Sequence, residues 1–176
     1  MLSFVIPVYN EQACLRDLNI RILNLIKKIN EKFEIIYIDD GSLDESLKII
    51  KELSIKNSEI KYISFIRNFG QHAAVMAGFA KARGDYIFTL DADLQNPPEE
   101  ISKLYNEITK GDYDIVTGVR SARKDGFFRK LTSLLMNKVI SSLSGVKLKD
   151  YGCMMRVYRK NIIENLIKYG EKSVYI

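Results

Sequence analysis

The stretch from 86 to 95, with the sequence YIFTLDADLQ, constrains this chain more than any other. Its first five residues are mostly apolar and β-prone, as in a strand that is buried on both faces. Asp91 and Asp93 follow directly, and Pro97 and Pro98 then end the strand and favour a helix start. Open α/β sheets bind ligands at the carboxyl ends of their strands. Because carboxylate oxygens suit Mg²⁺ or Mn²⁺, the stretch predicts a metal site that holds a diphosphate.

Strand-like and helix-like segments alternate along most of the chain. The predicted strands are 2–8, 34–39, 60–66, 85–91 and 113–119, and the predicted helices are 11–31, 43–56, 71–83 and 97–110. Apolar residues recur at helical spacing in the first helix, at Leu15, Leu18, Ile22, Leu25, Ile26 and Ile29. Repeated βα units predict an α/β fold with a mostly parallel sheet flanked by helices. At 176 residues, we expect one domain that covers 1–176.

The alternation loosens after Gly118. A basic loop is expected from Arg120 to Lys130, then a helix at about 128–143, a short strand and a helix that ends near Tyr169. The helix over 127–143 mixes apolar and basic residues, so it fits either an interfacial helix on anionic lipid or a helix packed on its own domain.

Composition is that of a globular protein, with 47% hydrophobic and 28% charged residues. The net charge of +5 suits a polyanionic partner, but it equally suits a lysine-rich solvated surface. Cys14 and Cys153 have no framework spacing, so we expect reduced thiols, with Cys153 in the core. Met1 leads straight into an apolar strand without a signal-peptide pattern, and no apolar run approaches the roughly 18 residues of a membrane-spanning helix.

Three predicted strands end in polar residues that should meet at one edge of the sheet. The candidates are Pro7, Tyr9 and Glu11 after the first strand, Asp39 and Asp40 after the second, and Asp91 and Asp93 after the fourth. So many carboxylates repel one another unless a cation or hydrogen-bond donors offset them. Asp39 and Asp40 also fit a plain turn before a helix capped by Ser42 or Asp44.

Other phosphate and metal motifs fit poorly. The chain has no P-loop, and no G-x-G-x-x-G follows the first strand. The segment from Asp91 begins like a calcium loop, but Asn96 and Ser102 occupy its glycine and glutamate positions. A phosphohydrolase with Asp91 as nucleophile and Asp93 as acid/base stays an alternative, although Gln95 replaces its usual threonine or valine.

The ordered motifs resemble family 2 glycosyltransferases, and in particular the branch that loads a sugar onto a polyprenyl phosphate, such as dolichol-phosphate mannosyltransferases and bactoprenol glucosyltransferases. The motifs are VIPVYNE at 5–11, IDDGS at 38–42, RNFG at 67–70 and DADLQNPP at 91–98. The segment DYGCMMR at 150–156 is especially similar to members that transfer a formamido-arabinose. The resemblance extends from Val5 to about Tyr169.

This resemblance implies a GT-A fold with a Rossmann-like sheet and a nucleoside-diphosphate-sugar donor, most simply a UDP-sugar. The implied base and ribose residues are Pro7, Tyr9, Glu11, Asp39 and Asp40. Arg67 and Asn68 would face the donor phosphate or ribose, whereas His72 is expected only to pack or cap a helix. Asp91 and Asp93, with Gln95, would hold Mg²⁺ or Mn²⁺ on the diphosphate.

The resemblance also implies that basic residues after Gly118 bind the lipid phosphate. Arg120 and Arg129 are the main candidates, and Arg123 and Arg156 the weaker ones, although the segment also fits a solvated basic loop. The implied reaction is metal-dependent, inverting sugar transfer to polyprenyl (undecaprenyl) phosphate, for cell-envelope glycan or lipid A modification. We expect no nucleic acid partner and a location at the cytoplasmic face of the inner membrane.

Similar enzymes usually continue into C-terminal membrane helices, which this sequence lacks. The alternative hypothesis is therefore an inactive, nucleotide-sugar-binding fragment that needs a membrane partner. The motifs predict neither the sugar nor the oligomeric state.

Overall fold

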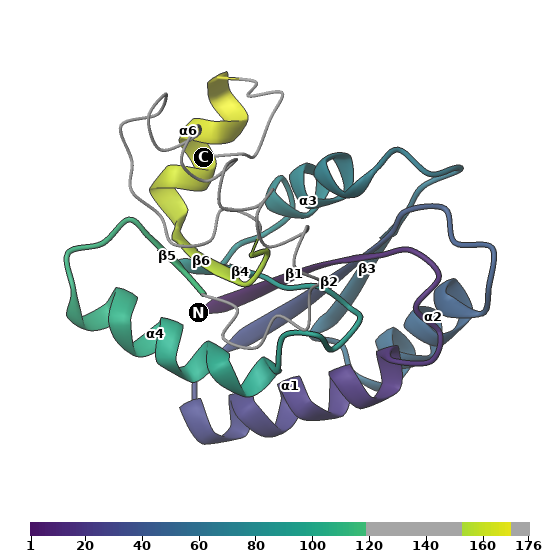
Figure 1. The fold of residues 1–176 in the computed structure, drawn as a ribbon, viewed down its shortest axis with the longest axis horizontal. Coiled ribbons are helices and arrows are strands. Elements are labelled where there is room, and N and C mark those ends of the chain that lie inside the picture. The colour runs from purple at the N-terminus through teal and green to yellow at the C-terminus, as the bar shows by residue number, and fades with distance from the viewer. Residues whose placement is uncertain (119–152, 170–176) are drawn as a thin grey trace, which may run out of the picture.

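The computed structural model describes residues 1–118 and 153–169, which form a six-stranded sheet with helices on both faces (Figure 1). The strands are β1 (Leu2–Val8), β2 (Phe33–Asp39), β3 (Ile60–Ser64), β4 (Tyr86–Thr89), β5 (Ile115–Thr117) and β6 (Arg156–Arg159). The helices are α1 (Leu15–Ile29), α2 (Ser46–Lys56), α3 (Gln71–Phe79), α4 (Ile101–Lys110), preceded by the 3₁₀ turn η1 (Pro98–Glu100), and α6 (Lys160–Tyr169).

The sheet order is β3-β2-β1-β4-β6-β5, and only β6 runs against its neighbours. The predicted α/β fold with a mostly parallel, helix-flanked sheet is confirmed. The short strand expected before the last helix is β6, which inserts between β4 and β5 rather than extending an edge. Such an insertion depends on pairing with distant strands, which local sequence patterns do not contain.

Each face of the sheet has its own apolar core because side chains alternate along a strand. Leu2, Phe4 and Ile6 of β1 pack on the face covered by α1, α2 and α4, whereas Val5 packs on the face covered by α3 and α6 (Figure 1). The predicted stripe of α1 is buried from Leu15 to Ile26. Cys153 is buried in the first core, as predicted.

Several predicted elements are too long. The first helix was expected from residue 11, but α1 begins at Leu15 because the N–H groups of residues 10–12 donate to side chains in the loop after β2 and at the start of α2. The fourth strand was expected to reach Asp91, but β4 ends at Thr89, so both aspartates lie in the following loop. The third helix, α3, ends at Phe79 rather than residue 83, in a turn whose N–H groups bond to the Gly78 carbonyl.

Two predictions fall outside the described residues, namely the basic loop and the helix expected at 128–143. Over 1–118 and 153–169, the structure contains no helix that is both long and apolar enough to cross a membrane.

Candidate functional site

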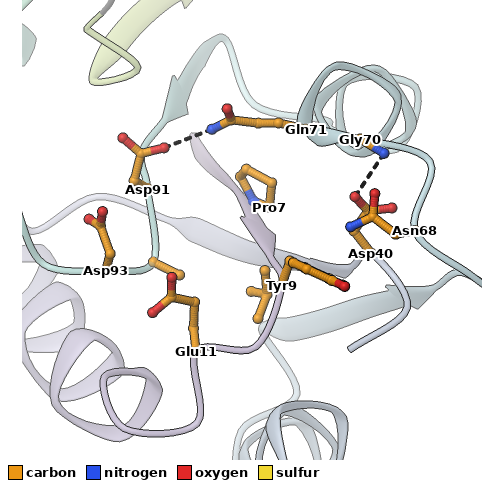
Figure 2. Close-up of a pocket in the computed structure, with 11 residues that line it drawn as sticks. Pro7, Tyr9, Glu11, Asp40, Asn68, Gly70, Gln71, Asp91 and Asp93 are labelled. Carbon is orange, nitrogen blue, oxygen red and sulfur yellow. Dashed lines mark hydrogen bonds between the residues drawn. The ribbon is translucent and has the colours of Figure 1, made fainter. Parts of the chain in front are cut away.

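A cavity of about 350 Å³ opens where β1, β2 and β4 end and α3 begins (Figure 2). It is lined by Pro7, Val8, Tyr9, Glu11, Asp40, Asn68, Gly70, Gln71, Asp91, Ala92 and Asp93. Seven predicted site residues therefore meet here, namely Pro7, Tyr9, Glu11, Asp40, Asn68, Asp91 and Asp93. Asp39, Arg67 and Gln95 are not in the lining, and Arg120, Arg123 and Arg129 lie outside the described residues.

The loop after β1 is fixed to the loop after β2 by reciprocal hydrogen bonds. Asn10, in the left-handed region with φ 57°, donates its N–H to Ser42 Oγ at 3.0 Å and accepts the Leu43 N–H at 2.8 Å. The Glu11 N–H donates to Ser46 Oγ at 2.8 Å. An asparagine tolerates this backbone conformation better than most residues. These bonds hold the backbone of Glu11 at the cavity wall.

The adjacent aspartates at the end of β2, Asp39 within the strand and Asp40 just after it, have different surroundings. Asp40 lines the cavity and accepts the backbone N–H groups of Phe69 and Gly70 at 2.7 and 2.9 Å. Asp39 is buried, and its carboxylate oxygens lie 3.4 Å from the donors Ser42 N–H and Ser64 Oγ. The bond to Ser42 fits the turn interpretation of Asp39, whereas Asp40 holds a loop from a different part of the chain.

The loop after β3 therefore rests on the end of β2. Gly41, with φ 70°, lies so close to Arg67 that an added Cβ would come within 2.4 Å of the Arg67 carbonyl carbon. The Arg67 guanidinium stacks over the half-exposed Phe69 ring, 4.7 Å from its centroid. The Arg67 guanidinium thus contacts Phe69, and Arg67 is not in the cavity lining.

The opposite wall is acidic. The carboxylates of Glu11, Asp91 and Asp93 lie together on one side of the cavity (Figure 2). Burial raises the pKa of Glu11, and the charges of Asp93, Asp44 and Asp91 raise it further. The Asp93 side chain accepts the Gln95 N–H at 2.9 Å, across Leu94 in the left-handed region. Gln95 thus supports Asp93 through its backbone, and its side chain is exposed.

Sequence reasoning missed Gln71 as a site residue. Its side-chain Nε2 donates to Asp91 Oδ1 at 2.8 Å, so the start of α3 is joined to the acidic wall (Figure 2). The only signal in the sequence was its place at a predicted helix start, directly after the RNFG motif. Its partner is twenty residues away along the chain, and only the folded sheet brings the two together.

Two further candidates do not line the cavity. Arg156 is buried in β6 and donates its Nε–H to the Cys153 carbonyl at 2.9 Å. His72 follows Gln71 on α3, and its Nδ1 is buried without a hydrogen-bond partner in the part of the chain that the structure describes. The side chain of His72 therefore does not cap the helix through this nitrogen.

The chain matches the family model described as Glycosyl transferase family 2 over residues 3–167. It is 45% identical to the undecaprenyl-phosphate 4-deoxy-4-formamido-L-arabinose transferase of Aeromonas hydrophila subsp. hydrophila, in an alignment that covers all of this chain and 54% of that protein. The chain thus spans about half the length of this relative. The predicted resemblance to the polyprenyl-phosphate branch is confirmed.

Solved structures give the same fold at lower identity. Glucosyl-3-phosphoglycerate synthase from Mycobacterium tuberculosis, solved with Mn²⁺, UDP and phosphoglyceric acid, matches with a TM-score of 0.69 and 21% identity, over 92% of this chain and 56% of that one. Residues 1–349 of TarS from S. aureus match with a TM-score of 0.61 and 18% identity, over 93% of this chain and 48% of that one. These likenesses confirm the predicted GT-A fold. By the family match and the curated relative together, the chain belongs to glycosyl transferase family 2.

Proposed function

We propose that this domain transfers a sugar from a nucleoside-diphosphate sugar, a UDP-sugar in the simplest case, to a polyprenyl phosphate such as undecaprenyl phosphate. The observation that supports the proposal is that one cavity has two walls of different chemistry. Glu11, Asp91 and Asp93 form the acidic wall, and Asp40 and the loop it holds form the other. At about 350 Å³, the cavity is in the size range of small-molecule sites.

The acidic wall fits a divalent cation. Burial is the main cause of the raised pKa of Glu11, and the charges of Asp93, Asp44 and Asp91, which a cation would offset, raise it further. Among the described residues, no three His, Cys, Asp or Glu side chains are placed to form a metal site. Mg²⁺ is commonly held by one or two carboxylates together with substrate phosphates, so Asp91 and Asp93 are a sufficient protein contribution. When bound there, Mg²⁺ or Mn²⁺ would neutralise charge on the leaving diphosphate.

The remaining cavity residues have roles that follow from their positions. The half-exposed Tyr9 ring and the side chain of Asn68 would contact the base and ribose. Glu11 and Asp40 border the same space, and Asp40 also fixes the loop that carries Asn68. Helix α3 begins at Gln71 in the cavity lining, and the positive end of its helix dipole would attract the donor diphosphate there. Pro7 lines the cavity, whereas Asp39 is buried and is not in the lining.

The acceptor step needs no strong base from the protein. A lipid phosphate is largely ionised near neutral pH, since its second pKa is about 6 by comparison with phosphoserine. Its oxygen would bond to the anomeric carbon on the face opposite the leaving group. The bond from that carbon to the diphosphate oxygen breaks, and the electron pair stays on the diphosphate. Arg120 and Arg129 remain our candidates for holding the acceptor phosphate, with Arg123 and Arg156 as weaker ones.

A second candidate function is a donor-binding fragment that is inactive without a membrane partner. The observation that favours it is length, because the chain corresponds to only 54% of the curated relative. In either case we place the domain at the cytoplasmic face of the inner membrane, where a polyprenyl phosphate would be accessible. Cell-envelope glycan synthesis and lipid A modification are the processes that would use the product.

The test uses the purified full chain, a panel of radiolabelled UDP-sugars, undecaprenyl phosphate in detergent, and Mn²⁺. Formation of a lipid-linked sugar that is lost in Asp91→Asn and Asp93→Asn supports the enzyme. Asp112→Asn is the matched control, since Asp112 is exposed and outside the cavity lining. UDP binding without any transfer or donor hydrolysis would instead support the binding fragment. Absence of UDP binding in calorimetry with and without Mn²⁺ would overturn both.

A further inference from the structure

We infer that Gln71 is a positioning residue that orients the carboxylate of Asp91 for the divalent cation. The inference rests on the function proposed above, and it concerns a residue that the sequence motifs did not assign. Its basis is the 2.8 Å hydrogen bond from Gln71 Nε2 to Asp91 Oδ1, in which both side chains line the cavity (Figure 2).

Contacts of the preceding residue and of the first turn of α3 fix the backbone position of Gln71. Gly70 precedes Gln71 and has φ 93°, a backbone conformation that residues with a side chain rarely adopt. The Gly70 N–H donates to Asp40 Oδ2. The Ala74 N–H donates to the Gly70 carbonyl at 3.2 Å, so the first turn is closed directly after this fixed point. Gln71 therefore leaves the helix from a defined backbone position.

Helix α3 packs closely against β1 and β2 of the sheet. A Cβ added at Gly78 would lie 2.3 Å from Val5 Cγ1 and 2.8 Å from Ile38 Cδ1, so the helix approaches β1 and β2 as closely as a glycine allows. Val75 and Phe79 are buried against the same core. Since the helix cannot shift easily, the Gln71 amide reaches Asp91 from a fixed support.

Asp91 itself lacks the support of a strand, because β4 ends at Thr89 and Asp91 lies in the loop that follows. Metal affinity depends on outer hydrogen bonds that fix the orientation of a ligand carboxylate, and the Gln71 amide supplies one to Asp91. The neutral amide of Gln71 donates a hydrogen bond without adding charge. A lysine there would compete with the cation, and a glutamate would lose the donor and add a further negative charge.

The same contacts connect the two walls of the cavity. Asp40 holds Gly70, Gly70 leads into Gln71, and Gln71 bonds to Asp91. The loop that would contact the nucleotide is thereby continuous with the support of the cation ligand.

The experiment measures Mn²⁺ binding directly in the full chain with UDP, by electron paramagnetic resonance of free Mn²⁺, beside calorimetry of UDP without metal. Gln71→Met keeps most of the side-chain volume and removes the donor, and Gln71→Ala removes both. We expect both variants to bind Mn²⁺ about 10- to 100-fold more weakly, the usual effect of losing an outer hydrogen bond to a ligand. Metal-free UDP affinity should change less than twofold. Lys81→Ala, an exposed change just beyond the far end of α3, should match the parent chain.

Unchanged Mn²⁺ affinity in Gln71→Met would overturn the inference while leaving the proposed function intact. A parallel loss of metal-free UDP binding in both variants would also overturn it, since it would indicate a general disturbance of the cavity. If the parent chain itself binds no Mn²⁺ with UDP, the proposed metal-dependent function fails and the inference fails with it.

Discussion

Asp40 accepts the backbone N–H of Gly70 at 2.9 Å, across thirty residues of sequence, and so fixes the loop after β3 to the end of β2. Its other oxygen accepts the Phe69 N–H at 2.7 Å. A buried carboxylate that accepts two backbone donors has a structural function, whatever it also contributes to a ligand.

Asp40→Ala should therefore destabilise the fold as well as weaken nucleotide binding. Hydrogen bonds to a charged group contribute about 1.5–3 kcal/mol, so we expect a loss of that order in the free energy of unfolding. Asp40→Asn keeps one acceptor oxygen and should lose less. Urea denaturation followed by circular dichroism measures both changes, and parental stability in Asp40→Ala would contradict the role given to this carboxylate.

The approach of Gly41 to Arg67 gives a second prediction. Gly41→Ala combines a φ of 70° with a Cβ placed 2.4 Å from a backbone carbon, so both strain and collision oppose it. Gly70→Ala meets strain alone, because nothing lies within 4 Å of its Cβ position. Backbone strain at a positive φ costs about 1–3 kcal/mol for a residue with a side chain. Thermal unfolding should show the larger decrease for Gly41→Ala, and equal decreases would exclude a backbone collision at this position.

Local patterns predicted the elements and the edge where the site lies, because apolar periodicity and strand ends are local properties. They could not separate Asp39 from Asp40, since adjacent residues on a strand face opposite ways and register decides which one reaches the cavity. Both carboxylates are buried, but Asp40 lines the cavity and accepts N–H groups from the loop after β3, whereas Asp39 is not in the lining.

Non-local contacts account for the other differences. Gln71 was missed because its partner Asp91 belongs to another strand end. Arg156 stays a weaker candidate for the lipid phosphate, but the sequence did not predict that its strand inserts between β4 and β5 or that its Nε–H donates to the Cys153 carbonyl. Pairing of β6 with β4 is not encoded in either segment alone. Local sequence patterns miss those site residues whose hydrogen-bond or strand partners are distant in sequence.

The buried Glu34 gives a prediction on pH. Burial by itself raises the pKa of this carboxyl, but hydrogen bonds from Lys61, Ser3 and the Arg83 N–H outweigh burial and leave the pKa below its usual 4.5. A lowered folded-state pKa stabilises the protein above the unfolded-state value, and this stabilisation is lost as the pH falls through the folded-state value.

Glu34→Gln should therefore lower the urea midpoint at neutral pH, and the difference from the parent should shrink below about pH 4.5. Loss of a buried acceptor costs about 1–3 kcal/mol, which sets the expected size at neutral pH. Glu107→Gln, an exposed change on α4, is the control and should leave the midpoint unchanged. A difference that stays constant across this pH range would contradict the role of the Glu34 charge.

The crowded carboxylates of the acidic wall predict opposite effects on stability and on ligand binding. The charge of Asp93 is the largest of the neighbouring charges that raise the pKa of Glu11, so removing it should relieve repulsion in the metal-free protein. Asp93→Asn retains a side-chain oxygen that can accept the Gln95 N–H, which keeps the loop in place. We expect metal-free Asp93→Asn to be more stable than the parent by up to about 1 kcal/mol, the range of partly exposed charge pairs.

The same substitution should abolish stabilisation by Mn²⁺ with UDP. A ligand that binds only the folded state increases the free energy of unfolding by RT times the logarithm of one plus the ratio of its free concentration to its dissociation constant, and so raises the melting temperature. Differential scanning calorimetry with and without Mn²⁺ and UDP therefore separates the two effects in one protein. The parent should gain stability from the pair of ligands, Asp93→Asn should not, and Asp112→Asn should follow the parent in both conditions. If Asp93→Asn is less stable without metal and still stabilised with it, the carboxylates are not a repulsive cluster that a cation offsets, and Asp93 has a structural role only.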